Sequence, residues 1–406
     1  MKTILILIGK ITQLSIVNIC EIPENIRNKA KFVLIINSNL QGQIEPKPLS
    51  SFDKVIYTPV NSASVYDEQE LYANVTLVCK EYSNIHAFVP DEMNVDIAEQ
   101  VLAKFNIPGW GQSTGKLCRD KVLMKEHMLK HGIRVPKFMP YTFNTDFNSL
   151  CDEIGLPFVL KPVDSCGSIG VYIIRNEEEY NQFLQIPDNY ENYEVEEYID
   201  GILYHVDSIK YEDQFFATVA RYSHPLAQAL DGKVVGAIEI PANNPLYEKL
   251  IQFNYKVVES FNNDGCYHHE LFVTKNGEII FLEIGWRACG APNYAIFAQH
   301  YGFYQTILSI ILNIDGKAPI APQKDNYRLE FLVPKKLGIY NGIKLPSLCG
   351  KAQIEHLIEL NTNLEHKPAL YSDACAKITI TYPTFDHDYD LILSDFNTLC
   401  GAQLYG

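Results

Sequence analysis

The stretch FVLKPVDSCGSIGV, residues 158–171, decides the fold because it joins an apolar strand to a small-residue loop. Lys161 ends the strand, and the loop that follows is rich in glycine and serine. Glycines leave backbone N–H groups open, and consecutive free N–H groups form a concavity that binds anions. The stretch therefore predicts a site that neutralises a triphosphate and excludes water from it. The loop residues with this expected role are Ser165, Gly167, Ser168 and Gly170. Taken alone, the same residues also fit a surface hairpin with an incidental lysine.

A second stretch, HHELFVTKNGEIIFLEIG at residues 268–285, predicts a β-hairpin that carries two opposed carboxylates. Its central Asn-Gly pair is a strong signal for a two-residue turn, and such a turn places Glu270 directly opposite Glu283. Like charges at opposed positions are destabilising unless a cation lies between them. Carboxylate and phosphate oxygens are the usual ligands of Mg²⁺. The alternation of a strand adds further residues to the same face: His268, Phe272, Phe281, Gly285 and Arg287.

The histidines of this hairpin and the arginine after it could each have more than one role. His268 and His269 point to opposite faces of the strand, so they cannot both join Glu270 around one zinc ion. His268 is expected to support the cation site or to pack. Arg287 would place a guanidinium beside the phosphates and stabilise charge that develops in phosphoryl transfer. Its alternative role is an ion pair with a local carboxylate.

The composition of the 406-residue chain is that of a globular protein, with 47% hydrophobic residues. The net charge of -15 argues against nucleic acid or an anionic membrane as a partner. Ten cysteines without a CxxC pair predict reduced thiols and a cytoplasmic protein. The apolar run at residues 4–8 is short and is followed by Lys10, so it predicts a buried first strand and not a signal peptide.

The first third of the chain alternates strands with helices, which predicts a parallel α/β sheet. The expected strands are 3–8, 31–36, 53–58 and 86–90, and the helices are 67–80 and 94–105. A helix that Asp120 caps should follow, because Gly132 and Pro136 mark its end. Further on, strands are expected at 158–162, 170–175, 193–199 and 203–211, and a helix at 245–261.

The order of these parts resembles the ATP-grasp superfamily over about residues 110–310. The segments that carry the resemblance are RDKVLMKEHMLKHGIRVPKF, PFVLKPVDSCGSIGV, YEVEEYIDG, YHVD and FLEIGWRACG. The ending EIGWRACG is similar to that of ATP-dependent carboxylate–amine ligases, which include the L-amino acid ligases that make dipeptides. The resemblance implies a multidomain α/β and α+β protein with an ATP-grasp fold. Its expected parts are a Rossmann-like pre-ATP-grasp domain (1–112), a small subdomain with the lysines and the flap (113–192), a large subdomain with the adenine slot and the Mg²⁺ site (193–318), and a strand-rich C-terminal region (319–406).

The resemblance also implies roles for single residues. Lys121 and Lys161 would hold the ATP phosphates, with Lys161 also catalytic, and Ser165 to Gly170 would form a mobile flap. Glu270 and Glu283 would bind one or two Mg²⁺ ions, and Arg287 would steady an acyl phosphate. The residues implied to line the adenine slot, mostly through backbone groups, are Glu196, Glu197 and Ile199.

Two departures from the family pattern bear on the site. Leu203 stands where many members carry a ribose-binding glutamate, so Tyr204, His205 or Asp207 would substitute for it. Gly285 stands where many members have an asparagine after the second metal-binding glutamate. On the substrate side, the segment 221–242 is expected near the carboxylate and the phosphates. The residues expected to contact substrate are Arg221, His224, His268, Trp286 and Arg287.

The function expected from this resemblance is amide formation from a small carboxylate and an amine, such as an amino acid. The reaction would consume Mg²⁺-ATP and release ADP and phosphate. The alternatives are another ATP-grasp enzyme, such as a carboxylase or a nucleotide-biosynthesis ligase, and a nucleotide-binding regulatory protein without turnover. The sequence identifies neither the acid nor the amine, and it leaves the oligomeric state open, with a homodimer as one option.

Overall fold

The computed structural model describes residues 1–10, 17–44, 46–186, 192–225, 228, 232–320, 326–366 and 373–405. All ten cysteines are free thiols. In the described part of the chain, no helix combines the length and the apolar character that crossing a membrane requires.

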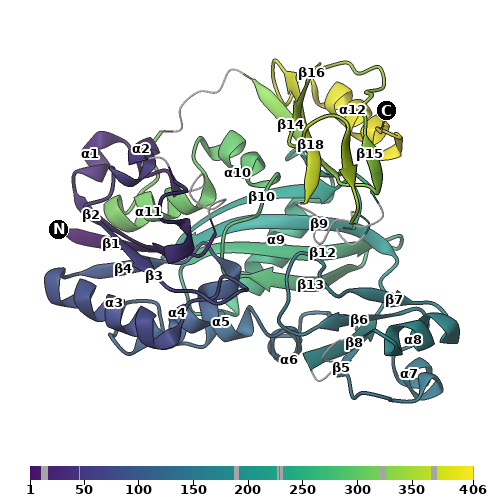
Figure 1. The fold of residues 1–406 in the computed structure, drawn as a ribbon, viewed down its shortest axis with the longest axis horizontal. Coiled ribbons are helices and arrows are strands. Elements are labelled where there is room, and N and C mark those ends of the chain that lie inside the picture. The colour runs from purple at the N-terminus through teal and green to yellow at the C-terminus, as the bar shows by residue number, and fades with distance from the viewer. Residues whose placement is uncertain are drawn as a thin grey trace.

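The N-terminal part is a four-stranded parallel sheet with helices packed on it (Figure 1). Its strands, in the order β3-β2-β1-β4, are β3 (Lys54–Thr58), β2 (Ala30–Asn37), β1 (Lys2–Ile8) and β4 (Ile85–Phe88). Its helices are η3 (Ile19–Glu21), α1 (Glu24–Arg27), η4 (Ser38–Leu40), α2 (Pro46–Leu49), α3 (Glu68–Glu81), η5 (Glu92–Asn94) and α4 (Val95–Ala103). The side chains of residues 4–8 are fully buried, as expected for a strand of a sheet that is covered on both faces.

The second part is a small antiparallel sheet of order β5-β8-β6-β7. Its strands are β5 (Phe138–Pro140), β6 (Phe158–Pro162), β7 (Tyr172–Ile174) and β8 (Tyr193–Glu197), and its helices are α5 (Thr114–Leu117), α6 (Lys121–Lys130), α7 (Phe147–Glu153) and α8 (Glu177–Leu184). Asp120 caps α6 as expected, by accepting hydrogen bonds from the backbone N–H groups of Val122 and Leu123. We expected the strand at 193 to open the large subdomain, but β8 pairs with β5 and β6 of the small sheet.

The third part is an eight-stranded sheet of order β13-β12-β9-β10-β11-β14-β18-β16, which extends from the large subdomain into the C-terminal region (Figure 1). Its strands are β9 (Gly201–Tyr211), β10 (Gln214–Tyr222), β11 (Val235–Glu239), β12 (Gly265–Thr274), β13 (Ile279–Gly285), β14 (Tyr327–Pro334), β16 (Lys351–His356) and β18 (Ala374–Tyr382). The remaining elements are α9 (Tyr247–Glu259), α10 (Tyr294–Tyr301), α11 (Gln305–Asp315), α12 (Tyr389–Gly401) and the two-stranded pair β15 (Gly338–Tyr340) and β17 (Thr362–Leu364).

The two faces of the β9–β12 region differ in what covers them. Helix α9 packs on the face that carries His269, whose Nδ1 lies 3.1 Å from the Asn254 side-chain nitrogen. Helix α11 packs on the opposite face, against Ile209 and Cys266. His205, Asp207 and Glu270 belong to this second face, because side chains alternate along a strand. The predicted separation of His268 from His269 is therefore confirmed.

The predicted hairpin forms, but two irregularities set its register. Thr274 and Glu278 close a three-residue turn with Gly277 at φ +79°, in place of the two-residue turn that we expected. A bulge between Glu270 and Leu271 then offsets this shift, so Glu270 still lies opposite Glu283. The bulge also changes which residue shares the face of Glu283. Phe281 stacks on the ring of His269 on the opposite face, so its assignment to the face of Glu283 is wrong. Leu282 borders the pocket together with Glu283 instead.

His300 and Glu239 form an ion pair that joins α10 to the large sheet, and we expect this pair to make the free energy of unfolding depend on pH. His300 Nδ1 lies 2.7 Å from Glu239 Oε1, and this hydrogen bond raises the pKa of His300. Stability from a raised histidine pKa is fully present below the unfolded value of about 6.5 and is lost as the pH rises through the folded value. We expect His300→Gln to destabilise the protein near pH 6 and to have little effect at high pH.

Urea unfolding of wild type and variant as a function of pH measures this difference. The exposed His387→Gln is the matched control and should give a profile parallel to wild type. Parallel profiles for His300→Gln as well would contradict the assignment.

Candidate nucleotide and metal site

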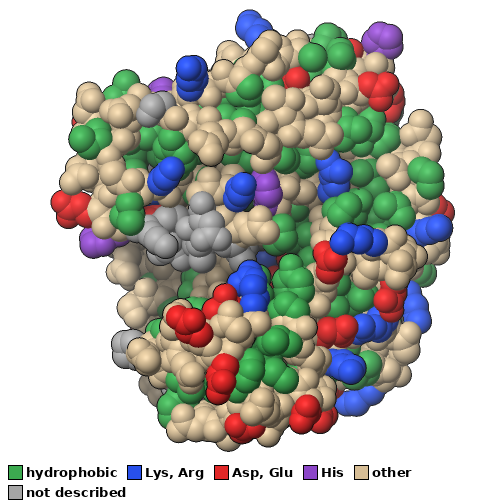
Figure 2. Space-filling view, turned by 90° about the vertical axis from the view of Figure 1, so that its right-hand side faces the viewer, with side chains coloured by type: hydrophobic (Ala, Val, Ile, Leu, Met, Phe, Trp, Pro, Cys, Tyr) green, Lys and Arg blue, Asp and Glu red, His purple; other side chains and the backbone are tan. Residues whose placement is uncertain are grey.

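Ten of the residues expected at the nucleotide site surround one open pocket of about 1020 Å³ between the small and large sheets. Figure 2 shows the side of the molecule on which the surface is hollowed between an upper and a lower part, with basic, acidic and apolar side chains around the hollow. The expected residues on its wall are Lys121, Lys161, Ser165, Gly167, Ser168, Glu196, Glu197, Ile199, Glu270 and Glu283. Apolar side chains complete the wall: Val159, Val171, Ile173, Leu203, Phe272 and Leu282.

Lys161 belongs to a buried network of two lysines and two glutamates. Its Nζ lies 2.6 Å from Glu196 Oε1 and 3.7 Å from Glu194 Oε1. Lys125 contacts the same two carboxylates from α6, at 3.0 Å in the case of Glu196. Burial lowers the pKa of Lys161, but Glu196 and Glu194 outweigh it and raise that pKa overall. Lys161 is therefore a fixed positive charge at the pocket wall.

Lys121, at the start of α6, contacts the flap and lies near Glu283. Its Nζ donates to the backbone oxygen of Ser165 at 2.6 Å and lies 3.9 Å from Glu283 Oε2. Burial lowers the pKa of Lys121, and the nearby Lys161 adds to this effect. The two lysines therefore present neighbouring ammonium groups to one end of the pocket, as a polyphosphate requires.

The flap, residues 165–170, lies close to its own strand because one of its glycines has a positive φ and no side chain. Gly170 has φ +72°, and a Cβ at this position would lie 2.8 Å from Pro162 Cγ and from the Tyr193 hydroxyl oxygen. Any side chain would push the loop off β6. Gly170 does not border the pocket itself but permits the close approach that brings Ser165, Gly167 and Ser168 to the pocket wall.

Glu270 and Glu283 fit a divalent cation. They are opposed across β12 and β13; Glu270 is buried, and the side chain of Glu283 is 33% exposed. Burial raises the pKa of Glu283, the facing Glu270 adds to this, and the net shift is upward although Lys121 opposes it. A cation between the two carboxylates would remove this penalty, and oxygen ligands of this kind suit Mg²⁺.

Arg287 pairs with a carboxylate from the N-terminal domain. Its Nε lies 2.8 Å from Glu92 Oε2, and Arg119 Nη1 lies 3.2 Å from Glu92 Oε1. Burial raises the pKa of Glu92, but Arg287 and Arg119 outweigh it and lower this pKa to about 2. Arg287 also borders a narrow cavity that shares Lys121 and Glu283 with the main pocket. The guanidinium therefore lies next to the expected phosphate end of the site.

Trp286 and Trp110 line a further cavity of about 380 Å³ together with Phe88 and Arg287. The two indole rings are 4.6 Å apart, and Trp286 Nε1 donates to the backbone oxygen of Asp264 at 3.2 Å. Trp286 is thus both part of the packed interface with the N-terminal domain and part of a cavity wall. His268 borders the narrow cavity between this one and the main pocket.

Three expected site residues lie elsewhere. Arg221 donates to Asn397 Oδ1 at 2.9 Å and stacks over Phe396, so it joins β10 to the C-terminal helix α12. His224 Nδ1 lies 3.3 Å from the backbone oxygen of Val234. Asp207 is completely buried in the sheet. None of the three borders the described pocket, so their roles toward ATP or substrate stay predictions, and residues 226, 227 and 229–231 of the same expected segment lie outside the described residues.

Four charged residues that shape the site were not predicted from the sequence: Glu92, Arg119, Lys125 and Glu194. Lys125 had a usable signal, since residues four apart share a helix face and Lys121 was already assigned. Glu194 likewise shares a strand face with Glu196. Glu92 had no local signal, because its partner Arg287 is 195 residues away in the chain.

Comparison with known proteins finds a family match over part of the chain. The family described as ATP-grasp domain matches residues 126–302. An L-arginine-specific L-amino acid ligase of Bacillus subtilis is 25% identical over 229 residues, which cover 54% of this chain and 55% of that protein. The chain thus spans about half the length of this curated relative.

Solved structures match nearly the whole chain. The L-amino acid ligase of Bacillus licheniformis superposes with a TM-score of 0.71 at 14% identity and 98% coverage of both chains. A carboxyaminoimidazole ribonucleotide synthase of Aspergillus clavatus, complexed with ATP, gives a TM-score of 0.67 at 16% identity, again with 98% coverage of both. These likenesses show that the chain has an ATP-grasp fold, and the match to the ATP-grasp domain lies within it, over residues 126–302.

Proposed function

We propose that the chain is an ATP-dependent carboxylate–amine ligase that forms an amide bond through an acyl phosphate and releases ADP and phosphate. The observation that carries this proposal is the convergence of Lys121, Lys161, the flap and the opposed Glu270 and Glu283 on one pocket. The relationship to an L-amino acid ligase supports the same reaction class.

We assign the two ends of the pocket to the two ends of ATP. The adenine lies between the apolar side chains and the segment of Glu197 to Ile199 that joins the two sheets. The phosphates lie against Lys121, Lys161 and the flap, and a cation held by Glu270 and Glu283 would supply the remaining charge neutralisation. The phosphate oxygens of ATP would accept charge-assisted hydrogen bonds from these two lysines.

In the first step, a carboxylate oxygen of the acid substrate forms a bond to the γ-phosphorus while the bond from that phosphorus to the β–γ bridging oxygen breaks. ADP leaves with the electron pair of the broken bond. Lys121 and Lys161 hold the phosphate oxygens in place, and the flap excludes water that would hydrolyse the acyl phosphate. The protein thus contributes mainly position and charge.

In the second step, the amine nitrogen attacks the carbonyl carbon, phosphate leaves, and the amine loses one proton to the solvent or to the departing phosphate. Arg287 borders both the cavity lined by Trp286 and the narrow cavity that contains Lys121 and Glu283. This position suits a group that stabilises the negative charge of the acyl phosphate. We place the acid and amine in the space between Trp286 and the phosphate end.

The test is ADP formation from Mg²⁺-ATP across a matrix of carboxylates and amino acids, with mass spectrometry of the products. We expect ADP only with a particular acid–amine pair, together with a product lighter than the sum of the pair by one water. ATP bound without substrate-stimulated turnover across a broad matrix would instead indicate a regulatory nucleotide-binding protein.

A second candidate function is supported by one set of relatives. An N5-carboxyaminoimidazole ribonucleotide synthase of Staphylococcus haemolyticus is 21% identical over 269 residues, which cover 65% of this chain and 68% of that protein. ADP formation that requires a phosphorylated ribonucleotide and bicarbonate, in place of an acid and an amine, would favour that reaction.

A further inference from the structure

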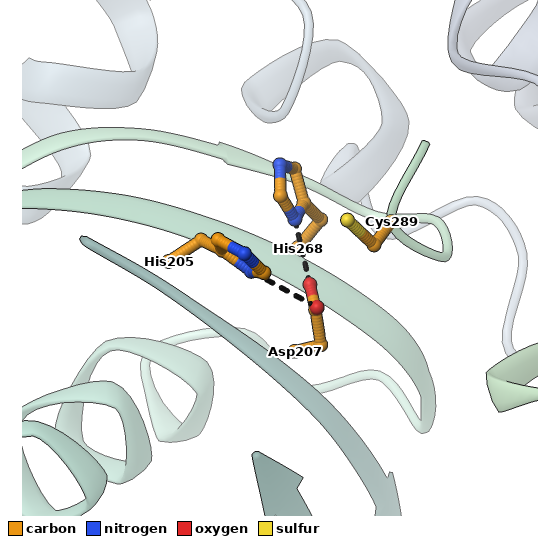
Figure 3. A group of neighbouring side chains, drawn as sticks. All are labelled: His205, Asp207, His268 and Cys289. Atoms are coloured by element: carbon orange, nitrogen blue, oxygen red, sulfur yellow. Dashed lines mark hydrogen bonds and ion pairs between the residues drawn. The ribbon is translucent and has the colours of Figure 1, made fainter. Parts of the chain in front are cut away.

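Four buried side chains converge beside Glu270, and we call them the histidine–cysteine cluster: His205, Asp207, His268 and Cys289 (Figure 3). One potential ligand atom from each lies within 4.8 Å of the others. All four side chains are buried, and the proposed ligase chemistry uses none of them. The cluster is therefore a polar site inside the protein that needs its own explanation.

The sheet holds this cluster rigidly. His205 and Asp207 are two residues apart on β9 and share a face, and Asp207 pairs with His268 across β9 and β12. Cys289 follows β13, and its backbone N–H donates to Gln305 Oε1 of α11 at 3.1 Å. The four residues thus come from two neighbouring strands and an anchored loop, so the fold fixes the positions of their backbones and leaves only the side-chain torsions to adjust.

Hydrogen bonds leave this cluster incompletely satisfied. His268 Nδ1 lies 2.6 Å from Asp207 Oδ1. His205 Nδ1 lies 3.0 Å from Asp207 Oδ2, but the geometry is not that of a hydrogen bond, and His205 Nε2 has no partner either. A buried polar group that is left unsatisfied destabilises the folded protein. His205 Nδ1 and Asp207 Oδ2 are thus buried side by side without a hydrogen bond, and a cation bound between them would supply the missing partner.

We propose that the histidine–cysteine cluster binds one Zn²⁺ ion through two imidazoles, one carboxylate and one thiolate. This is a four-ligand donor set of the kind that zinc prefers, and four buried protein ligands define a closed, structural site. The soft thiolate and the imidazoles select against Mg²⁺, which takes oxygen ligands. A divalent ion with one carboxylate and one thiolate is also neutral overall, as a buried site requires.

The dimensions are compatible with this ion. Bond lengths of about 2.0–2.3 Å place the ligands of tetrahedral Zn²⁺ roughly 3.3–3.8 Å apart. The widest present separation, 4.8 Å, would contract by roughly 1.0–1.5 Å, and the 2.6 Å between His268 Nδ1 and Asp207 Oδ1 would lengthen by about 0.7 Å or more, through changes in side-chain torsions.

The histidine–cysteine cluster also contacts Glu270, one of the two residues that we assign to Mg²⁺. His268 Nε2 lies 3.3 Å from Glu270 Oε1, and Glu270 accepts a second hydrogen bond from the Tyr222 hydroxyl at 2.6 Å. A zinc-bound histidine commonly donates its other ring N–H to a carboxylate. With zinc on Nδ1 of His268, the Nε2–H group donates to Glu270 and fixes the orientation of that carboxylate. The zinc ion would thus be a positioning element for the ligase site.

The first test is metal analysis of the 406-residue chain, purified without chelator and dialysed against excess Mg²⁺ to displace ions from Glu270 and Glu283. We expect one zinc per chain. Replacement of the zinc by Co²⁺ should give the near-ultraviolet thiolate-to-cobalt charge-transfer absorption and the intense visible bands of a tetrahedral site. A chain that holds no zinc and shows no such absorption when titrated with Co²⁺ overturns the proposal.

Three variants assign the ligands. Cys289→Ser should abolish the charge-transfer absorption and weaken zinc binding by at least about 100-fold, since it removes a ligand outright. Cys375→Ser, which changes another fully buried thiol, and Glu283→Gln should keep both the zinc and the absorption. If Cys289→Ser does not fold, the cobalt spectrum of the wild type alone still decides. An unchanged spectrum in folded Cys289→Ser, or its loss in Glu283→Gln, rejects this site.

Discussion

Replacing Glu283 with glutamine should reduce Mg²⁺-dependent ADP formation by about 100- to 1000-fold or more. The substitution keeps the size of the side chain but removes one of the two opposed carboxylates that we assign to the cation. Charge neutralisation of the phosphates is the main contribution of such a site to phosphoryl transfer. The measurement is the initial rate of ADP release with saturating substrates over a range of Mg²⁺ concentrations.

The same variant should not be less stable than wild type in metal-free buffer. Burial and the facing Glu270 raise the pKa of Glu283, so ionised Glu283 destabilises the folded state near neutral pH. Glutamine removes that repulsion. Thermal unfolding should therefore show an equal or higher midpoint without metal, together with the loss of the shift that Mg²⁺ and ATP cause in wild type.

A matched control lies on the same hairpin. Glu278→Gln changes an exposed glutamate that pairs only with Arg134, at 3.4 Å among the contacts described. This variant should retain wild-type turnover and its response to Mg²⁺. Full activity of Glu283→Gln, or equal losses in both variants, would contradict the cation site.

The parts of the fold that rest on local patterns could be predicted from the sequence. The apolar runs of the N-terminal sheet, the cap at Asp120 and the opposition of Glu270 to Glu283 each depend on residues close in the chain. The opposition of Glu270 to Glu283 was predicted from a two-residue turn that does not form. The three-residue turn and the bulge shift the register in opposite directions, so the two residues still face each other. A pattern of alternating residues cannot reveal such a compensation, and so Phe281 was assigned to the wrong face.

Contacts between distant segments could not be predicted in this way. The Glu92–Arg287 pair and the contact of Arg221 with α12 depend on how domains pack, and no local spacing encodes that. The histidine–cysteine cluster illustrates the same limit. Adjacent histidines at 268 and 269 correctly argued against a zinc site with Glu270, yet β9 and the loop after β13 bring other ligands to His268.

Replacing Lys125 with methionine should lower the free energy of unfolding by about 3–5 kcal/mol, the range measured when one partner of a buried ion pair is removed. Lys125 is completely buried and contacts Glu194 and Glu196, which are also buried. Without it, Lys161 alone faces both carboxylates. Urea unfolding at neutral pH measures the loss, and Lys130→Met, at the exposed end of the same helix, should cost little.

A second substitution separates charge from packing. In the Lys125→Met background, Glu194→Gln removes the surplus negative charge and should restore a large part of the lost stability, because an uncompensated buried charge is the main cost. No recovery would mean that the lysine stem, and not its charge, stabilises the small sheet. Recovery would mean that the network exists to keep two carboxylates neutralised while Lys161 is held at the pocket wall. The stability of the small sheet and the position of Lys161, which we assign to the phosphates, would then depend on the same four charges.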